Sequence, residues 1–225
     1  DWLRCVLRSD GTAEPVPAYV AAAKRYRRAD LGARSYASLS YRAVARSLDQ
    51  GPARLLVMSA TAGRQMKASV AVALTFLRAH WALVERELLS GKTEAERALC
   101  RAKAFDREVR LWVFTADVTV DGPSASVAFA LSLLHTFTGL EFCSDTALTG
   151  TLSMSTGAVG PVGSVDDKAK AAQASGLKRL IVPSRYGVQA EKVRTEEVCR
   201  KGRLKLQHVD SIWDAIRLCV KTKTR

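Results

Sequence analysis

The sequence has no long apolar run, and this absence limits the classes of protein it can encode. No stretch of about 18 apolar residues occurs in the 225-residue chain, so we expect no membrane span. The first ten residues are mixed and charged, unlike a secretory signal peptide. Because the chain starts at Asp1 instead of an initiator methionine, we expect a processed chain or a fragment of a longer protein.

Cysteine and histidine are also scarce, and neither shows the spacing of a metal site. The cysteines are Cys5, Cys100, Cys143, Cys199 and Cys219. They never form a C-x-x-C pair, and an odd number without framework spacing favours an intracellular reducing compartment. That compartment could be the cytoplasm, the mitochondrial matrix or another organelle lumen. The histidines His80, His135 and His208 lack the mutual spacing of a metal site or a Ser–His pair. We therefore expect no metal.

Basic residues, by contrast, are in large excess. The net charge is +13, whereas the apolar content of 48% and the charged content of 25% are ordinary for a globular protein with a buried core. Three explanations of the excess are open. It could attract nucleic acid or an acidic partner. It could also reflect an Arg- and Ala-rich genome or an organelle-targeted protein, or the chain could be the basic part of a larger protein whose other parts are acidic. Aromatic residues are only 7%, and Tyr26 alone lies within a basic cluster, so nucleic-acid binding has weak support.

Strand-like and helix-like patterns alternate along the chain, which predicts an α/β (α+β) fold. Residues 1–35 are polar and are expected to form an N-terminal extension or linker, with a short helix at 18–26. Residues 36–225 are expected to form the domain. The expected strands are 36–48, 55–58, 109–120, 146–154, 159–162, 180–182 and 204–209. The expected helices are 61–89, 124–138, 165–175, 190–198 and 211–220, and the charged segment 93–104 is expected to be a surface helix or a loop insertion.

One candidate nucleophile lies where a strand gives way to a buried helix. Residues 121–126 read Asp-Gly-Pro-Ser-Ala-Ser, so a tight turn places Ser124 at the start of an apolar helix. Helix N-termini offer unpaired N–H groups and partial positive charge, which can stabilise an oxyanion. The same residue types also suit a purely structural role, because serine is a favoured N-cap and Gly-Pro a favoured turn.

A candidate base lies in segment 160–172, which reads Gly-Pro-Val-Gly-Ser-Val-Asp-Asp-Lys-Ala-Lys-Ala-Ala. Ser164 and Asp167 have the spacing of a capping box, which places Lys168 in the first turns of the next helix. The helix dipole and burial would both lower the pKa of this lysine and allow it to act as a general base. Its neighbours Asp166 and Asp167 would raise that pKa, and a solvated lysine on a polar face is the alternative.

Together these segments resemble the proteolytic domain of the Lon protease family. The catalytic serine of that family lies in a D-G-P-S-A-G run and matches Ser124, with Asp121 and Gly122 as supporting residues. The catalytic lysine is the second lysine of a P-I-G-G-L-K-E-K run and matches Lys168. A threonine that contacts this lysine in the family matches Thr149, within the Thr-Gly pair 149–150.

The resemblance is collinear from about Arg54 to Val220. Residues 60–69 resemble a G-x-L-G-x-x-M-K-E-S helix start, and residues 174–183 resemble an A-x-G-I-K…I-I-P stretch. It implies a Lon-type proteolytic domain with short sheets packed by helices. The departures lie around the dyad: Val120 replaces Lys, Ser126 Gly, Thr151 Glu, Ser164 Gly and Asp166 Lys, and the loop at 155–158 is about one residue longer.

The resemblance implies a serine endopeptidase with a Ser124–Lys168 dyad that needs no cofactor of its own. It further implies an upstream ATPase domain that binds ATP and magnesium, a homo-hexamer, and unfolded or damaged proteins as substrates. Residues 90–93, Ser-Gly-Lys-Thr, end like a P-loop, but Arg86 stands where its first glycine should be, so we expect no ATPase within this chain.

Two alternatives remain open. The first is a catalytically inactive Lon-fold module that serves as a structural or assembly subunit and contacts an acidic partner or RNA. The drift around the dyad and the charge of +13 favour it. The second is a Lon-like domain attached to a DNA-repair ATPase. Relatives of that kind usually lack the catalytic serine, so Ser124 counts against it.

Overall fold

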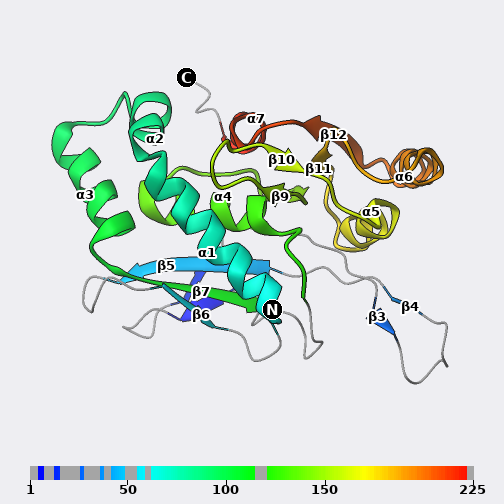
Figure 1. The fold of residues 1–225 in the computed structure, drawn as a ribbon, viewed down its shortest axis with the longest axis horizontal. Helices are drawn as coiled ribbons and strands as arrows, with labels where there is room; N and C mark the ends of the chain where they lie inside the picture. Colours follow the sequence, from blue (N-terminus) through cyan, green and yellow to red (C-terminus); the bar gives the residue numbers. More distant parts are fainter. Residues whose placement is uncertain are drawn as a thin grey trace.

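The computed structural model describes residues 5–7, 13–15, 26–27, 36–37, 42–48, 55–58, 62–114 and 121–221 (Figure 1). Its strands are β1 Cys5–Leu7, β2 Ala13–Pro15, β3 Tyr26–Arg27, β4 Tyr36–Ala37, β5 Arg42–Leu48, β6 Leu55–Met58, β7 Glu108–Phe114, β8 Thr146–Leu148, β9 Thr151–Leu152, β10 Val159–Gly160, β11 Arg179–Pro183 and β12 Lys205–Val209. Its helices are α1 Arg64–Ala79, α2 Trp81–Leu88, α3 Glu94–Phe105, α4 Ser126–Thr138, α5 Val165–Ala174, α6 Gln189–Lys201 and α7 Ile212–Cys219. This mixture of helices and short sheets confirms the expected fold class.

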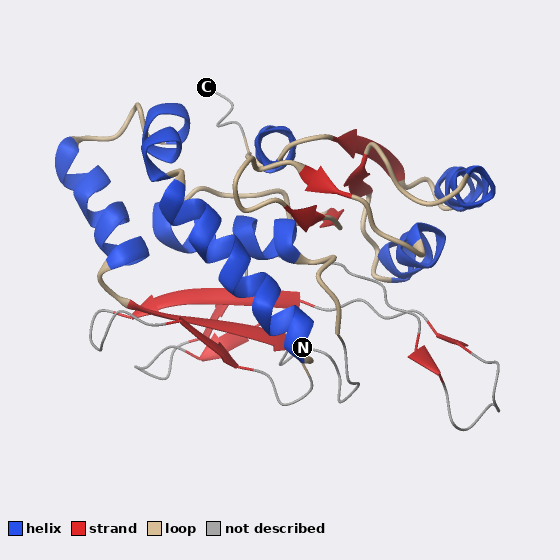
Figure 2. Ribbon diagram, in the orientation of Figure 1, coloured by secondary structure: helices blue, strands red, loops and turns tan. Residues whose placement is uncertain are grey.

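Two three-stranded sheets organise the described part of the chain. In the first, of order β5-β7-β6, β7 pairs antiparallel with β5 and parallel with β6. The second, of order β12-β11-β8, is wholly parallel. Helices α1, α3 and α4 lie over one face of the first sheet, and α5, α6 and α7 gather around the second (Figure 2).

The parallel sheet separates two apolar clusters because neighbouring residues of a strand point to opposite faces. On one face, Leu180 and Val182 of β11 pack with Ala169 and Ala172 of α5. On the other face, Ile181 joins the larger cluster, which contains α1, α4 and α7. Burial on both faces explains why residues 180–182 of β11 form an apolar run, as strands of parallel sheets commonly do.

Helix α4 is the central helix of the larger cluster. Eleven of its residues are buried, including Phe129, Leu133 and Phe137. A helix that is buried along most of its length carries apolar residues on most of its sides. It ends at Gly139, whose left-handed φ of 71° suits glycine at this position. Its N-terminus directly follows the turn that carries Ser124.

Several expected boundaries were wrong. The helix expected at 61–89 is two helices that meet at His80 with a bend of 69°. His80 leaves the helical conformation and stacks its ring on Phe76, at a centroid distance of 4.2 Å. The strand expected at 146–154 is split into β8 and β9 by residues 149–150. The helix expected from residue 124 begins at Ser126.

Other expectations fall partly on residues outside the described ranges. These are residues 18–25 of the short helix, residues 38–41 of the strand at 36–48, residue 61 of the helix at 61–89 and residues 115–120 of the strand that begins with β7. The last residue of the predicted short helix, Tyr26, lies in β3, so the helix prediction is wrong there. Within the described residues, no single helix is long and apolar enough to cross a membrane. Helices α1 and α2 meet that criterion only as a bent pair, by length and composition.

Candidate active site

Ser124 lies in a turn just before α4. Gly122 has a φ of 117°, a conformation that favours glycine, and Ser126 N–H donates to the Pro123 carbonyl at 3.1 Å. The N-cap position belongs to Ala125, so Ser124 stands one residue outside the helix and its side chain is not the cap. The structural role proposed for it, helix capping, is therefore wrong. Ser124 is partly exposed, whereas the helix behind it is buried.

Asp121 joins this turn to the start of α1. One carboxylate oxygen, Oδ1, accepts the N–H groups of Met66 and Gly122, each at 2.9 Å. Met66 is the third residue of α1, whose N-cap is Gly63, a residue without a side chain. A Cβ at Gly63 would lie 2.2 Å from Asp121 Cγ. Asp121 thus caps a helix that begins 57 positions earlier in the chain, and the glycine leaves room for it.

Thr149 and Gly150 hold the backbone of Ser124 from the other side. They directly follow β8, and Thr149 N–H donates to the Ile181 carbonyl of β11 at 3.0 Å. The Ser124 carbonyl accepts Gly150 N–H at 2.8 Å and the Thr149 hydroxyl at 3.2 Å. Thr149 is buried. The parallel sheet therefore fixes the Ser124 turn through two donors that converge on one oxygen.

Lys168 is buried on the inner face of α5, with an exposed fraction of 6%. Val165, Ala169 and Ala172 share this face at helical spacing. The solvated lysine considered as an alternative is therefore wrong. The predicted capping box is wrong as well, because Ser164 adopts a left-handed conformation and its side chain does not cap α5. Instead, Val165 N–H donates to the Glu191 carboxylate at 2.7 Å.

The two aspartates beside Lys168 have cationic partners of their own. Asp166 pairs with Arg194 of α6 at 3.1 Å, and Asp167 pairs with Lys170 at 3.1 Å. The pair with Arg194 reduces the opposition that the Asp166 carboxylate offers to a neutral Lys168. The side chain of Lys170 is 55% exposed, so the two lysines of this helix lie in different environments.

The remaining reactive side chains of the described residues lie elsewhere. The Nδ1 atoms of His80 and His135 contact the carbonyls of Phe76 and Leu140, and the His208 ring stacks on Tyr186. Burial raises the pKa of the Cys199 thiol to about 11 and that of Cys219 to about 12, which disfavours either thiolate as a nucleophile. No cluster of three metal-ligating side chains occurs in the ranges described.

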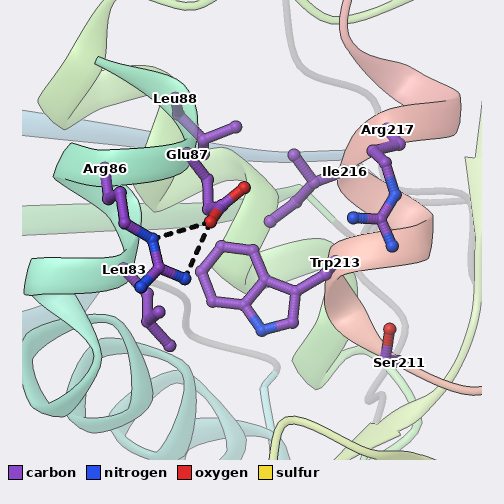
Figure 3. Close-up of a pocket in the computed structure, with 8 residues that line it drawn as sticks. All are labelled: Leu83, Arg86, Glu87, Leu88, Ser211, Trp213, Ile216 and Arg217. Carbon is purple, nitrogen blue, oxygen red and sulfur yellow. Dashed lines mark hydrogen bonds and ion pairs between the residues drawn. The ribbon is translucent and has the colours of Figure 1, made fainter. Parts of the chain in front are cut away.

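Two further surface features are separate from the Ser124 turn. In the P-loop-like segment 90–93, Thr93 forms a capping box with Glu96 at the start of α3. A pocket of about 380 Å³ opens between α2 and α7 (Figure 3). Its lining residues are Leu83, Arg86, Glu87, Leu88, Ser211, Trp213, Ile216 and Arg217. Ser124, Thr149 and Lys168 take no part in this lining.

The sequence matches the family model of the Lon protease (S16) C-terminal proteolytic domain over residues 44–221. The chain belongs to this family. Ser124, Thr149 and Lys168 all fall within the matched range. The peptidase function is therefore supported at the level of the family, and so are the terms hydrolase, protease and Lon.

Curated Lon proteases from distant organisms resemble the chain. Peroxisomal Lon protease homolog 2 of Xenopus laevis is 33% identical over 138 residues, 61% of this chain and 15% of that protein. Lon protease 1 of Thermus thermophilus is 31% identical over 156 residues, 69% of this chain and 18% of that protein. Lon protease of Paraburkholderia phytofirmans is 28% identical over 170 residues, 75% of this chain and 19% of that protein. The chain thus matches less than a fifth of the length of these relatives.

Proposed function

We propose that the chain is the serine endopeptidase domain of a Lon-type protease and that Ser124 and Lys168 form its catalytic dyad. The observation that carries the proposal is the burial of Lys168 on the inner face of α5. Burial disfavours the charged ammonium, so a buried lysine can be a neutral amine near neutral pH and can then accept a proton as a general base. The partly exposed Ser124 stands in a turn held by Asp121, Thr149 and Gly150.

In the proposed reaction, Ser124 Oγ attacks the carbonyl carbon of the scissile peptide bond while Lys168 Nζ accepts the hydroxyl proton. Backbone N–H groups around Ser124 stabilise the oxyanion of the tetrahedral intermediate. Lys168 then returns the proton to the leaving amine, and an acyl-enzyme forms. Water activated by the same lysine hydrolyses this ester and restores the serine.

Thr149 supports the dyad from the parallel sheet. Its hydroxyl donates its one proton to the Ser124 carbonyl, and its oxygen lone pairs leave it able to accept from an ammonium or amine. The role expected of it, contact with Lys168, is compatible with this geometry. We propose that Thr149 orients Lys168 while it also fixes the backbone of the nucleophile.

We further propose that the proteolytic domain works with an upstream ATPase domain that binds ATP and magnesium. Unfolded or damaged proteins are the proposed substrates, and six copies form the proposed assembly. No cofactor is proposed for the domain itself. Residues 36–225 are the proposed proteolytic domain, preceded by the polar extension at 1–35, and an intracellular reducing compartment is the proposed location.

The alternative function is an inactive Lon-fold module that contacts an acidic partner or RNA. Two observations favour it besides the charge of +13. Ser126, which replaces a family glycine, is buried. Its hydroxyl donates to the Pro123 carbonyl inside the Ser124 turn. Ser164, which also replaces a glycine, has a φ of 55°. Each substitution alters the surroundings of a dyad residue.

Mutation of the dyad distinguishes the two functions. In the full-length protein supplied with ATP and magnesium, Ser124→Ala should abolish cleavage of an unfolded substrate. Lys168→Ala should lower it by more than about a hundredfold, because general-base catalysis contributes about 10²–10⁴. Lys168→Arg should not rescue it, since a guanidinium keeps its proton. Fragments separated by electrophoresis give the readout.

Lys170→Ala is the matched control. It removes a lysine from the same helix, and the exposed pair with Asp167 contributes at most about 1 kcal/mol to stability. Its activity should match the wild type. Wild-type protein that cleaves nothing, or Ser124→Ala protein that cleaves as well as the wild type, would replace the peptidase with the inactive module.

A further inference from the structure

Helix α5, which carries Lys168, starts without a cap from its own sequence. The residue at its N-cap position is Ser164, whose φ of 55° and ψ of 44° turn its side chain away from the capping role. The first N–H groups of any α-helix lack partners within the helix. The N–H of Val165, the first residue of α5, therefore needs an acceptor from another part of the chain.

Glu191 of α6 supplies that acceptor. Its Oε1 atom accepts Val165 N–H at 2.7 Å across 26 positions of sequence, and its exposed fraction is only 9%. Helices α5 and α6 pack side by side against the parallel sheet (Figure 1). A carboxylate at this end of a helix also interacts favourably with the helix dipole.

The loop before α6 makes room for this carboxylate. Gly187 has a φ of 51°, and a Cβ on it would lie 2.2 Å from Glu191 Oε2. A second contact joins the same two helices, the pair between Asp166 and Arg194, but the Arg194 side chain is 57% exposed. An exposed ion pair of this kind contributes little. Glu191 is thus the buried anchor between α6 and the first turn of α5.

Lys168 follows Val165 by three positions, so the two residues lie on one face of α5, and both are buried. A displacement of the Val165 backbone is therefore passed to Lys168 within a single turn. We infer that Glu191 is a positioning residue, which holds the first turn of α5 so that Lys168 keeps its place relative to Ser124. This inference rests on the proposed function.

Three substitutions of Glu191 separate the effect of its side-chain length from the effect of its negative charge. Glu191→Gln keeps an acceptor oxygen at the same reach and loses the charge, whereas Glu191→Asp keeps the charge and is one methylene too short. Glu191→Ala removes both. Glu197→Ala is the matched control, because Glu197 lies on the same helix, exposed and paired with Lys201.

Cleavage of a short fluorogenic peptide by the full-length protein gives kcat and KM for each variant. Misplacing a catalytic group by about 1 Å can cost about a hundredfold in rate. We expect Glu191→Asp and Glu191→Ala to lower kcat by about 10- to 100-fold with KM within about twofold of wild type. We expect Glu191→Gln to stay within about threefold, and Glu197→Ala to match the wild type.

The hydrogen exchange rate of the Val165 amide tests the anchor itself. It should rise in Glu191→Asp and Glu191→Ala and stay slow in Glu191→Gln. If Glu191→Ala fails to fold, the contrast between the glutamine and aspartate variants decides the question. Equal activity of those two variants, or a more active aspartate variant, would overturn the inference.

Ser124→Ala measured in parallel keeps this inference distinct from the proposed function. An inactive Ser124→Ala protein beside a fully active Glu191→Asp protein overturns the positioning role and leaves the dyad in place. A Ser124→Ala protein as active as the wild type overturns both.

Discussion

Ser164 is held in a left-handed backbone conformation, with a φ of 55°. For a residue with a Cβ this conformation costs about 1–2 kcal/mol, whereas glycine adopts it freely but loses more entropy on folding. The Lon family pattern has a glycine at this position. Ser164→Gly should therefore raise the free energy of unfolding by about 0.5–1 kcal/mol, measured by urea denaturation.

The control for Ser164→Gly is Ser175→Gly at the other end of α5. Ser175 has a φ of −86°, which any residue adopts, so glycine there relieves no backbone strain and adds its entropic cost. The control should be no more stable than the wild type. A Ser164→Gly protein less stable than the wild type would show that the serine side chain contributes more than its backbone conformation costs.

At the scale of single residues, the sequence indicated Ser124 and Lys168 through their match to the Lon family motifs. Val165, Ala169 and Ala172 recur at helical spacing on the face of Lys168, so its burial follows from the pattern once the helix is accepted. Glu191 could not be predicted in the same way, since its partner lies 26 positions away. The capping-box prediction failed for the same reason, because a distant carboxylate took the role of Ser164.

At the scale of elements, α1 and the Ser124 turn depend on one close approach, between Gly63 and Asp121. A Cβ at Gly63 would overlap the Asp121 carboxylate, so Gly63→Ala should displace it from Met66 N–H. Loss of a helix cap typically lowers the free energy of unfolding by about 1 kcal/mol. We expect this loss in urea denaturation, together with reduced peptide cleavage, because Asp121 also holds Gly122.

Gly91→Ala is the control for Gly63→Ala. A Cβ at Gly91 would meet no atom within 4 Å, so the substitution adds the same methyl group without a clash. Its stability and peptide cleavage should stay close to those of the wild type. If Gly63→Ala behaved like Gly91→Ala in both assays, the coupling between α1 and the Ser124 turn would be refuted.

Element types were largely predictable, whereas breaks within elements were not. Periodicity gave the helices of the C-terminal half and the strands β6, β11 and β12 to within a few residues. No glycine or proline marks the break at His80. The stacking of its ring on Phe76 is a feature of the folded structure that the sequence pattern does not reveal. Residues 149–150 interrupt a strand-like pattern because they hydrogen-bond to Ser124 and Ile181 instead.

At the scale of the whole molecule, the proposed site lies where the two apolar clusters meet. Ser124 precedes α4 of the larger cluster, and Lys168 lies on α5 of the smaller one. Thr149 and Gly150 donate to the Ser124 carbonyl, and Thr149 N–H donates to Ile181 of the parallel sheet, whose two faces belong to different clusters. The proposed dyad therefore depends on the docking of both clusters, which local sequence patterns cannot specify.

Assembly is the corresponding prediction at this scale. We expect the full-length protein to sediment as a hexamer in the presence of ATP and magnesium, as members of the Lon family are expected to do. Sedimentation velocity over a range of protein concentrations provides the measurement. A monomer that persists at high concentration with ATP and magnesium present would count against an ATP-driven Lon machine.

The central claim is that Ser124 is a nucleophile activated by Lys168, and covalent labelling tests it most directly. The full-length protein is treated with a serine-reactive phosphonate that carries a peptide, and the modified residue is identified by mass spectrometry. We predict one adduct, on Ser124, which Lys168→Ala abolishes and Lys170→Ala leaves unchanged. An adduct on another residue, such as Ser126, or labelling of Ser124 that is equally fast without Lys168 would contradict the claim.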